Sequence, residues 1–139
     1  MKIKFKKLSP SAVVPTKAHA SDAGLDLVAV SKSKDRDGNF VYGTGLAFEI
    51  PEGYVGLVFP RSSVSARCMT MANCVGVIDS CVRGEVTVKF RQHLFAKPYD
   101  KGDRVAQMII MPYPHVDFVE ANELSDSDRG DGGYGSTGK

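Results

Sequence analysis

Short stretches in which apolar and polar residues alternate recur along most of this chain. A period of two is the pattern of a β-strand with one buried face, and glycine, proline and Asp-Gly turn sequences separate the stretches. The expected strands cover residues 2–8, 23–30, 40–42, 46–50, 54–59, 86–90 and 105–111. Only residues 62–71 are expected to form a helix, and a short one. Many brief strands with turns between them predict an all-β sandwich or barrel.

Residues 73–84 combine extended-chain residues with a single carboxylate. Valines in this stretch suit an extended backbone, and a glycine can lie where a ligand or a tight turn leaves no room for a side chain. Asp79 closes a Gly-Val-Ile sequence, where a carboxylate can activate a water, and the amide of Asn73 can read the edge of a pyrimidine. The alternative is structural, with the Asp capping a turn and the Asn bonding its own backbone.

Composition favours a single domain and gives no sign of several kinds of partner. The 139 residues suffice for one core, and a net charge of +2 provides no broad electrostatic footprint for nucleic acid or an anionic membrane. Lysines in residues 2–7 alternate with Ile3 and Phe5, which is typical of a protected edge strand. No apolar run reaches membrane-spanning length, and no signal peptide is expected.

The cysteines and histidines indicate neither redox nor zinc chemistry. Cys68, Cys74 and Cys81 stand among apolar or small residues without a Cys-x-x-Cys pair. We expect small buried thiols in a reducing, cytoplasmic compartment. The histidines are scattered without ligand spacing, so no protein-held zinc is expected.

The composition changes at Ser125. Residues 125–139 contain one aromatic and no aliphatic residue, so they cannot bury enough apolar area to order themselves. We therefore expect a domain of residues 1–124 and a mobile tail of residues 125–139. Consecutive glycine N–H groups in the tail could wrap an anion such as a polyphosphate, and Tyr134 could lie on a flat ring. A plain flexible linker is the alternative.

Five stretches, in chain order, resemble the five motifs of the homotrimeric dUTPase family, whose members convert dUTP to dUMP and pyrophosphate. They read Ala-Gly-Leu-Asp-Leu (23–27), Pro-Arg-Ser-Ser (60–63), Gly-Val-Ile-Asp with Arg-Gly (76–79 and 83–84), Gly-Asp-Arg-Val-Ala-Gln (102–107) and a glycine-rich tail (129–138). The likeness runs from about Ser21 to the end of the chain. It implies a distorted β jelly roll of the β-clip type, and a homotrimer whose active sites are shared between subunits.

The resemblance assigns the catalytic role to Asp79, the carboxylate that would position and deprotonate the attacking water. Asn73 would read uracil, and Val82 would lie at the deoxyribose. Asp26 would be tied to the water shell of a metal ion, with no protein group binding the metal directly. The other substrate-binding residues would be Arg61, Ser62, Ser63, Gly76, Gln107, Arg129, Tyr134, Gly135, Ser136 and Thr137.

The implied reaction is attack of water on the α-phosphorus of dUTP, with pyrophosphate as the leaving group. A triphosphate carries several negative charges, so Mg²⁺ is the implied cofactor, bound chiefly by phosphate oxygens and waters. Closure of the tail would expel bulk water. The implied role is to limit uracil incorporation into DNA and to supply dUMP for dTTP synthesis.

One position departs from the family pattern, and two other functions share parts of it. Three residues after the catalytic carboxylate the family usually has an aromatic, most often Tyr, where this chain has Val82; we expect UTP still to be excluded, though less severely. dCTP deaminase shares the fold and an Arg-Ser-Ser stretch, but Lys89 and Ala66 stand where it places a catalytic Glu and Arg. A non-catalytic jelly-roll trimer acting as a binding or regulatory module is the other alternative.

Overall fold

Strands dominate the computed structural model, which describes residues 1–138. Within this range ten strands and one 3₁₀ helix follow in the order β1 (Lys4–Lys7), β2 (Leu25–Val28), β3 (Ser31–Lys34), β4 (Phe40–Gly43), β5 (Leu46–Glu49), β6 (Tyr54–Pro60), η1 (Ser62–Ala66), β7 (Met69–Met71), β8 (Gly76–Ile78), β9 (Thr87–Gln92) and β10 (Arg104–Pro112). A strand forms within every stretch where alternation predicts one. The all-β class is thereby confirmed.

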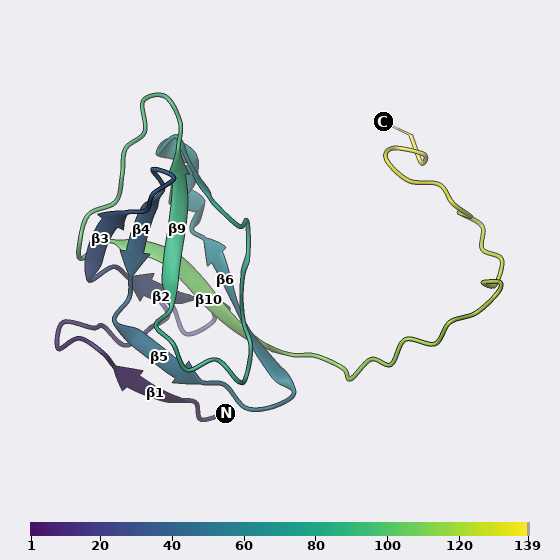
Figure 1. Ribbon diagram of the computed structural model, residues 1–139, viewed down its shortest axis with the longest axis horizontal. Helices are drawn as coiled ribbons and strands as arrows, with labels where there is room; N and C mark the ends of the chain where they lie inside the picture. The colour runs from purple at the N-terminus through teal and green to yellow at the C-terminus, as the bar shows by residue number, and fades with distance from the viewer. Residues whose placement is uncertain (139) are drawn as a thin grey trace.

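The strands pair antiparallel and form three sheets (Figure 1). β1 pairs with β5; β2, β10, β6 and β8 are neighbours in that order in the second sheet; and β3, β4, β9 and β7 make the third. Alternate side chains of these strands meet in one core, whose largest fully buried members include Leu27, Tyr42, Leu46, Phe90 and Met108. One face of most strands is therefore committed to packing, and the strand ends and loops carry the exposed chemistry.

Tyr42, Phe90 and Tyr99 form the aromatic centre of the core. Edge contacts join Tyr42 to Phe90 and to Tyr99, with ring centroids 6.0 and 5.9 Å apart. The Tyr42 hydroxyl donates a 3.1 Å hydrogen bond to the Tyr99 carbonyl, and burial raises the pKa of Tyr42 to about 12. The guanidinium of Arg67 lies over the Tyr99 ring at 3.9 Å. These contacts fix the loop of residues 93–103 that leads into β10.

β3 is a strand that hydrophobic alternation does not predict, because it consists of serines and lysines alone. Its backbone pairs with β4 along its whole length. The Lys34 ammonium nitrogen lies 4.7 Å from the centroid of the Phe40 ring on β4. Cross-strand pairing and this cation–π contact therefore replace the buried face that other strands have.

The helix expected over residues 62–71 is only half correct. A 3₁₀ helix ends at Ala66, and Met69 and Met71 belong to β7 with both side chains buried. Cys68 separates the two with a φ of 51°, a left-handed conformation that a right-handed helix cannot continue. Core burial of the two methionines thus overrides helix propensity here.

The three cysteines are free and exposed, which corrects the expectation of buried thiols. Cys68 and Cys74 lie in turns with φ values of 51° and 60°. The neighbouring Met69, Met71 and Gly76 are the residues that face the core at these points. The small-residue surroundings of the cysteines therefore mark turns and not core positions.

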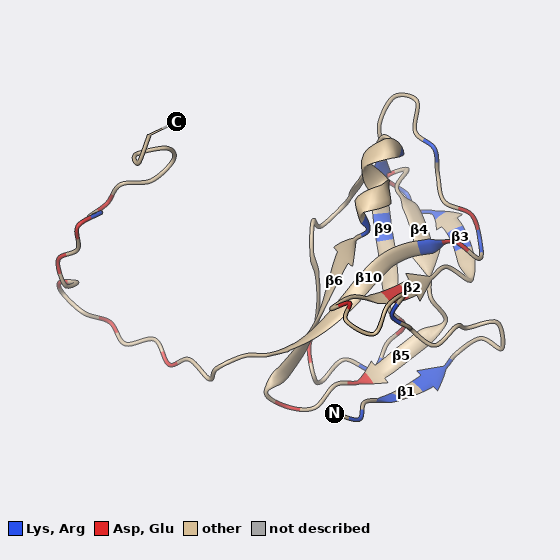
Figure 2. Ribbon diagram, turned by 180° about the vertical axis from the view of Figure 1, so that it is seen from behind, with Lys and Arg blue, Asp and Glu red and all other residues tan. Residues whose placement is uncertain are grey.

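β1 is an exposed edge strand, as its lysines predict. All four of its residues are exposed, and β5 is its partner. Lys4 forms an ion pair of 3.2 Å with Glu49 on β5, and Figure 2 shows the basic residues along this edge. No helix within residues 1–138 has the length and hydropathy needed to cross a bilayer.

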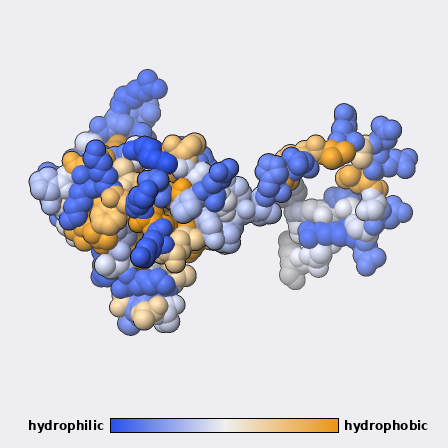
Figure 3. All heavy atoms as spheres, turned by 90° about the horizontal axis from the view of Figure 1, so that it is seen from below, coloured by the Kyte–Doolittle hydropathy of each residue, from blue (hydrophilic) through white to orange (hydrophobic). Residues whose placement is uncertain are grey.

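The chain leaves the body of the molecule after β10. Residues 113–138 contain no strand and run away from the sheets as one extended segment (Figures 1 and 3). Exposed apolar side chains occupy its first half: Tyr113, Val116, Phe118, Val119 and Leu124. Phe118 is 96% exposed, so this segment makes few apolar contacts within one chain. Residues 113–124 are called the apolar arm below.

Asp35 organises the turn between β3 and β4. Its Oδ1 accepts hydrogen bonds of 3.0 Å from the backbone N–H groups of Asp37 and Asn39. Its Oδ2 accepts bonds of 3.1 Å from the Asn39 amide and the Lys89 ammonium. These bonds, that of the Asn39 side chain above all, lower the pKa of Asp35 from 3.8 to about 2.

Asp35 should therefore make stability depend on pH in the acid range. Because its folded-state pKa lies below the unfolded value, its contribution is present above about pH 4 and is lost as the pH falls toward about 2. We expect Asp35→Asn to lose less stability over this interval than the wild type, as measured by urea unfolding. Asp37→Asn, with a side chain that is 69% exposed, is the control and should follow the wild type. Equal losses for Asp35→Asn and wild type would contradict the assignment.

Candidate active site

The second sheet brings three separate stretches together near the C-terminal end of β6. β10 lies between β2 and β6, and Gln107 on β10 is opposite Asp26 on β2 and Phe59 on β6. Arg61 and Ser62 follow β6 directly. These residues surround a hollow of about 430 Å³, called the Arg61 hollow, which is lined by Ala18, Asp22, Ala23, Gly24, Asp26, Phe59, Arg61, Ser62, Gln107 and Ile109.

The carboxylate of Asp26 holds two arginines at this hollow. Its Oδ1 accepts a 2.8 Å bond from Arg61 Nε, and its Oδ2 accepts a 3.2 Å bond from Arg104 Nη1. The side chains of Asp26 and Arg61 are only 15% and 26% exposed, so water screens this pair weakly. Since Arg61 bonds Asp26 through Nε, its terminal NH₂ groups remain as donors for an anion. The arrangement is a preorganised cation suited to a phosphate oxygen.

Gln107, on β10, also lines the hollow. Its amide Nε2 donates a 3.1 Å bond to the Pro60 carbonyl, which leaves the second N–H of the amide as a donor. A Cβ atom at Gly24 would overlap the Gln107 side chain, so glycine lets the 22–26 segment pass over it. Ser62, at the start of the 3₁₀ helix, lines the same hollow, whereas Ser63 is exposed on that helix and is not among the lining residues.

A second group of expected site residues lies along β8. Gly76 pairs with Val58 on β6, and a Cβ at Gly76 would come within 3.2 Å of the Val58 Cβ, so the two strands approach closely there. Asn73 is exposed in the turn before β8, and Asp79 is exposed directly after it. Val82, 37% exposed, follows in a turn in which its N–H donates to the Asp79 carbonyl at 3.1 Å.

One chain does not bring the two groups together. β8 runs antiparallel to β6 with Ile78 opposite Gly56, so Asp79 lies beside the N-terminal end of β6. Arg61 follows the C-terminal end of the same strand. Asp79 continues the register opposite Val55, six residues before Arg61, which is about 20 Å at roughly 3.4 Å per residue. A carboxylate cannot act on a phosphate held at that distance within one subunit.

The expected tail residues join neither group. Arg129, Tyr134, Gly135, Ser136 and Thr137 lie in the extended segment that Figures 1 and 2 show away from the sheets. Local bonds shape the segment, among them Arg129 Nε to the Gly132 carbonyl at 3.0 Å. Tyr134 is fully exposed at a positive φ of 43°.

The structure adds two residues that sequence reasoning did not assign to the site. Arg104 shares the Asp26 carboxylate, and Asp22 lines the Arg61 hollow while accepting a 2.8 Å bond from the His19 N–H. Arg104 lies inside the fourth motif, and this position was a reason to expect it near the site. The motif alone does not show that its side chain reaches Asp26, because that contact depends on the β2–β10 pairing.

The donor set of the hollow fits a magnesium ion that arrives on a phosphate chain. Among residues 1–138 no cluster of three or more His, Cys, Asp or Glu side chains could hold a metal. Asp22 and Asp26 supply carboxylates at the hollow, and both Asp26 oxygens already bond an arginine. Mg²⁺ dehydrates reluctantly and keeps several waters, so carboxylates that accept hydrogen bonds from those waters would suit it.

The fold and the hollow define an all-β protein with donors suited to phosphate at one end of an antiparallel sheet. Comparison with known proteins agrees with this class. The dUTPase family model matches residues 11–138. The deoxyuridine 5'-triphosphate nucleotidohydrolases of Corynebacterium glutamicum and Nautilia profundicola are 43% and 41% identical, the alignments covering 99% and 100% of this chain and 95% and 100% of those proteins. The chain belongs to the dUTPase family.

Solved structures give the same result for the fold. The dUTPase of Staphylococcus bacteriophage 80alpha with dUPNHPP superimposes with a TM-score of 0.86 at 28% identity, covering 99% of both chains. A G164S mutant of that enzyme with dUpNHpp gives a TM-score of 0.84 at 27% identity, also over 99% of each chain. The dUTPase-like β fold expected from the motifs is therefore confirmed.

Loss of the Asp26 carboxylate should destabilise the fold measurably. Asp26→Asn removes the charge that two guanidinium groups share in a partly buried setting, and charged hydrogen bonds are worth about 1.5–3 kcal/mol. We expect a decrease of about 1–2 kcal/mol in the free energy of unfolding, measured by urea denaturation. Asp37→Asn, whose side chain is 69% exposed in the turn between β3 and β4, is the control and should change it by less than about 0.5 kcal/mol. A value for Asp26→Asn no larger than that of the control would show that the pairs contribute little.

Proposed function

We propose that this protein is a dUTP pyrophosphatase, which hydrolyses dUTP to dUMP and pyrophosphate. The observation that carries the proposal is the convergence of Asp26, Arg61, Ser62 and Gln107 on one hollow with donors suited to phosphate. Membership of the dUTPase family and the likeness to a phage dUTPase solved with dUPNHPP support the choice of nucleotide. In cells the reaction limits uracil incorporation into DNA and supplies dUMP for dTTP synthesis.

The proposed active unit is a homotrimer with active sites at the subunit contacts. Asp79 and the Arg61 hollow lie about 20 Å apart in one chain, by the strand spacing, so a working site takes them from different copies. The apolar arm supports association, because side chains such as Phe118 and Leu124 are 96% and 90% exposed in one chain. In a closed ring each copy supplies one part of a site and receives the other.

The nucleotide then lies with its base along β8 and its phosphates in the hollow of a neighbour. Asn73 and the β8 backbone, that of Gly76 included, read the uracil edge, and Val82 packs near the deoxyribose. A site that leaves buried polar groups unpaired with a wrong base can discriminate by roughly 10⁴-fold. Arg61, Ser62 and Gln107, which line the hollow, hold the phosphates.

In the proposed step a water oxygen attacks the α-phosphorus while Asp79 accepts its proton. The bond from the α-phosphorus to the bridging oxygen breaks, and the electron pair leaves with pyrophosphate. The Ser62 hydroxyl and the Arg61 guanidinium stabilise the charge that grows there. A bound Mg²⁺ would supply further neutralisation of the triphosphate, with Asp22 and Asp26 near its waters.

The tail is proposed to close over the bound nucleotide. Residues 125–139 place Tyr134 on the base and direct Arg129, Gly135, Ser136 and Thr137 to the outer phosphates. Glycine N–H groups and one guanidinium suit an anion. Closure excludes bulk water and completes the site.

A comparison of substrates tests the function directly. Pyrophosphate release from dUTP, dCTP and UTP is measured beside ammonia release. We expect pyrophosphate from dUTP, no ammonia, and a kcat/KM for UTP that is lower but measurable because Val82 covers less of the sugar than an aromatic ring would. Similar kcat/KM values for dUTP and UTP would remove the deoxy-specific label, and no turnover of any nucleotide would favour the binding module.

Deamination is the weaker candidate on structural grounds as well. Lys89 stands on β9 in the third sheet, outside the sheet that carries the Arg61 hollow. Its ammonium is paired with Asp35 at 3.1 Å. Ammonia release in the assay above would nevertheless overturn the pyrophosphatase proposal.

Asp79→Asn should separate binding from chemistry. The amide keeps the shape of the side chain but accepts a proton poorly, and general-base catalysis contributes about 10²–10⁴-fold. We expect kcat for dUTP to fall at least ~10²-fold while the Kd of a non-hydrolysable dUTP analogue changes by less than about threefold. Asp37→Asn, in the exposed turn between β3 and β4, serves as the control with normal turnover. Retention of wild-type kcat by Asp79→Asn would assign the base elsewhere.

Deletion of residues 125–139 tests the tail. We expect the truncated protein to remain a folded trimer, by circular dichroism and sedimentation, while its kcat for dUTP falls by about 10²-fold or more through loss of closure and positioning. A variant in which a Gly-Ser segment of equal length replaces the tail is the control, and it should behave like the truncation. Full activity of either variant rules out the lid.

A further inference from the structure

The segment that carries Asp79 has firm anchors at its two ends and little between them. Upstream, Ile78 is paired with Gly56 on β6. Downstream, the Val86 N–H donates to the Leu46 carbonyl at 2.8 Å, and the fully buried Thr44 hydroxyl donates to the Val86 carbonyl at 2.7 Å. Residues 79–84 between these anchors belong to no strand and are largely exposed. Only interactions within the turn itself can therefore hold it in one conformation.

Arg83 supplies bonds inside this turn. Its Nη1 donates to the Ser80 carbonyl at 2.6 Å and to the Val82 carbonyl at 2.9 Å. The Val82 N–H closes the turn on the Asp79 carbonyl at 3.1 Å. One guanidinium therefore ties two carbonyls of a turn that begins at Asp79 and ends next to Val82. Both bonds come from the Nη1 amino group, whose two N–H donors suffice for the two carbonyls.

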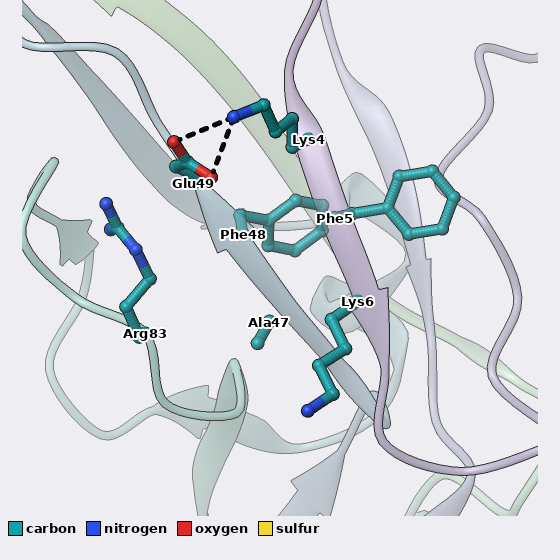
Figure 4. Close-up of a pocket in the computed structure, with 7 residues that line it drawn as sticks. All are labelled: Lys4, Phe5, Lys6, Ala47, Phe48, Glu49 and Arg83. Carbon is teal, nitrogen blue, oxygen red and sulfur yellow. Dashed lines mark hydrogen bonds and ion pairs between the residues drawn. The ribbon is translucent and has the colours of Figure 1, made fainter.

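Within residues 1–138 Arg83 forms no ion pair, although Glu49 and Glu52 line a neighbouring hollow with it. It lies across a hollow of about 420 Å³ from the β1–β5 pair, as Figure 4 shows. The acidic residue lining that hollow is Glu49, and Figure 4 shows it turned to Lys4, with which it pairs at 3.2 Å. The next acidic residue along the chain, Glu85, accepts a 2.7 Å bond from the Gly45 N–H.

We propose that Arg83 is a positioning residue, which locks the 79–82 turn so that Asp79 and Val82 are presented to the nucleotide in one fixed geometry. The inference rests on the proposed function for the roles of those two residues, but the lock itself is a property of the free protein. A displacement of about 1 Å in a catalytic group can cost roughly 10²-fold in rate. Loss of the lock should therefore lower kcat without a matching loss of nucleotide affinity.

The test compares Arg83→Ala, Arg83→Lys and the control Arg36→Ala, whose wild-type side chain is 94% exposed at another turn. Amide hydrogen exchange at Val82 reports the lock without any substrate, and dUTP turnover reports its use. For Arg83→Ala we expect faster exchange at Val82 and a kcat lower by about 10- to 100-fold, with KM changed by less than about threefold. Arg83→Lys should fall between, and Arg36→Ala should match the wild type in both measurements.

Three results would overturn the proposal. One is unchanged exchange at Val82 in Arg83→Ala. Another is unchanged kcat in that variant although exchange is faster. The third is a loss confined to affinity that is larger for dUTP than for dUMP, which would make Arg83 a direct phosphate contact. If the wild type released no pyrophosphate from dUTP, the proposed function would fail while the exchange result would still decide whether the lock exists.

Discussion

The register of β10 against β2 and β6 is the constraint on which the candidate site depends. Ala106 and Met108 are buried, at 0% and 2% exposure, while Gln107 between them faces the Arg61 hollow. A slip of one residue would turn every side chain of β10 to the opposite face. Burying Gln107 would leave its amide without hydrogen-bond partners, and exposing the two apolar neighbours would lose their packing. Core packing thus fixes the register of β10, and this register places Gln107 at the site.

Electrostatics then acts within this frame. Asp26 lies on β2 opposite Gln107, next to the fully buried Leu27, so the ladder fixes its carboxylate. That carboxylate orients Arg61 and Arg104 by charged hydrogen bonds. Asp22 also lines the hollow, so the carboxylates there balance the two guanidinium groups, and it is the free NH₂ donors of Arg61 that suit a phosphate oxygen.

A strand that carries one site component at each end cannot bring those components together by itself. β6 has Asp79 beside its first residues and Arg61 after its last, and its stiffness keeps them apart. Association of identical copies would bring the two components together, because each contact then pairs the Asp79 of one copy with the Arg61 hollow of another. The apolar arm and the glycine-rich tail, which run away from the sheets, are available for such contacts (Figure 1). Function here is proposed to belong to an assembly.

Local pattern was sufficient for most of the strands and for the residue types of the site. Alternation marked β1, β2, β4, β5, β6, β9 and β10, since one face of each strand must be apolar. β3 could not be found that way, because serines and lysines pair by backbone alone. β7 was not predicted, because its residues are also compatible with a helix. Cys68 and Cys74 are exposed because they lie at left-handed backbone positions, which residue type does not predict.

The sequence by itself determined the β class, the turns between the strands and the residues whose side chains can bind or react. These features depend on local periodicity and on side-chain type. Only the tertiary structure decided which of them meet. It placed Gln107 against Asp26, recruited Arg104, and set Asp79 far from Arg61. Such pairings depend on register between strands distant in the chain, and register is a property of packing that no single stretch contains.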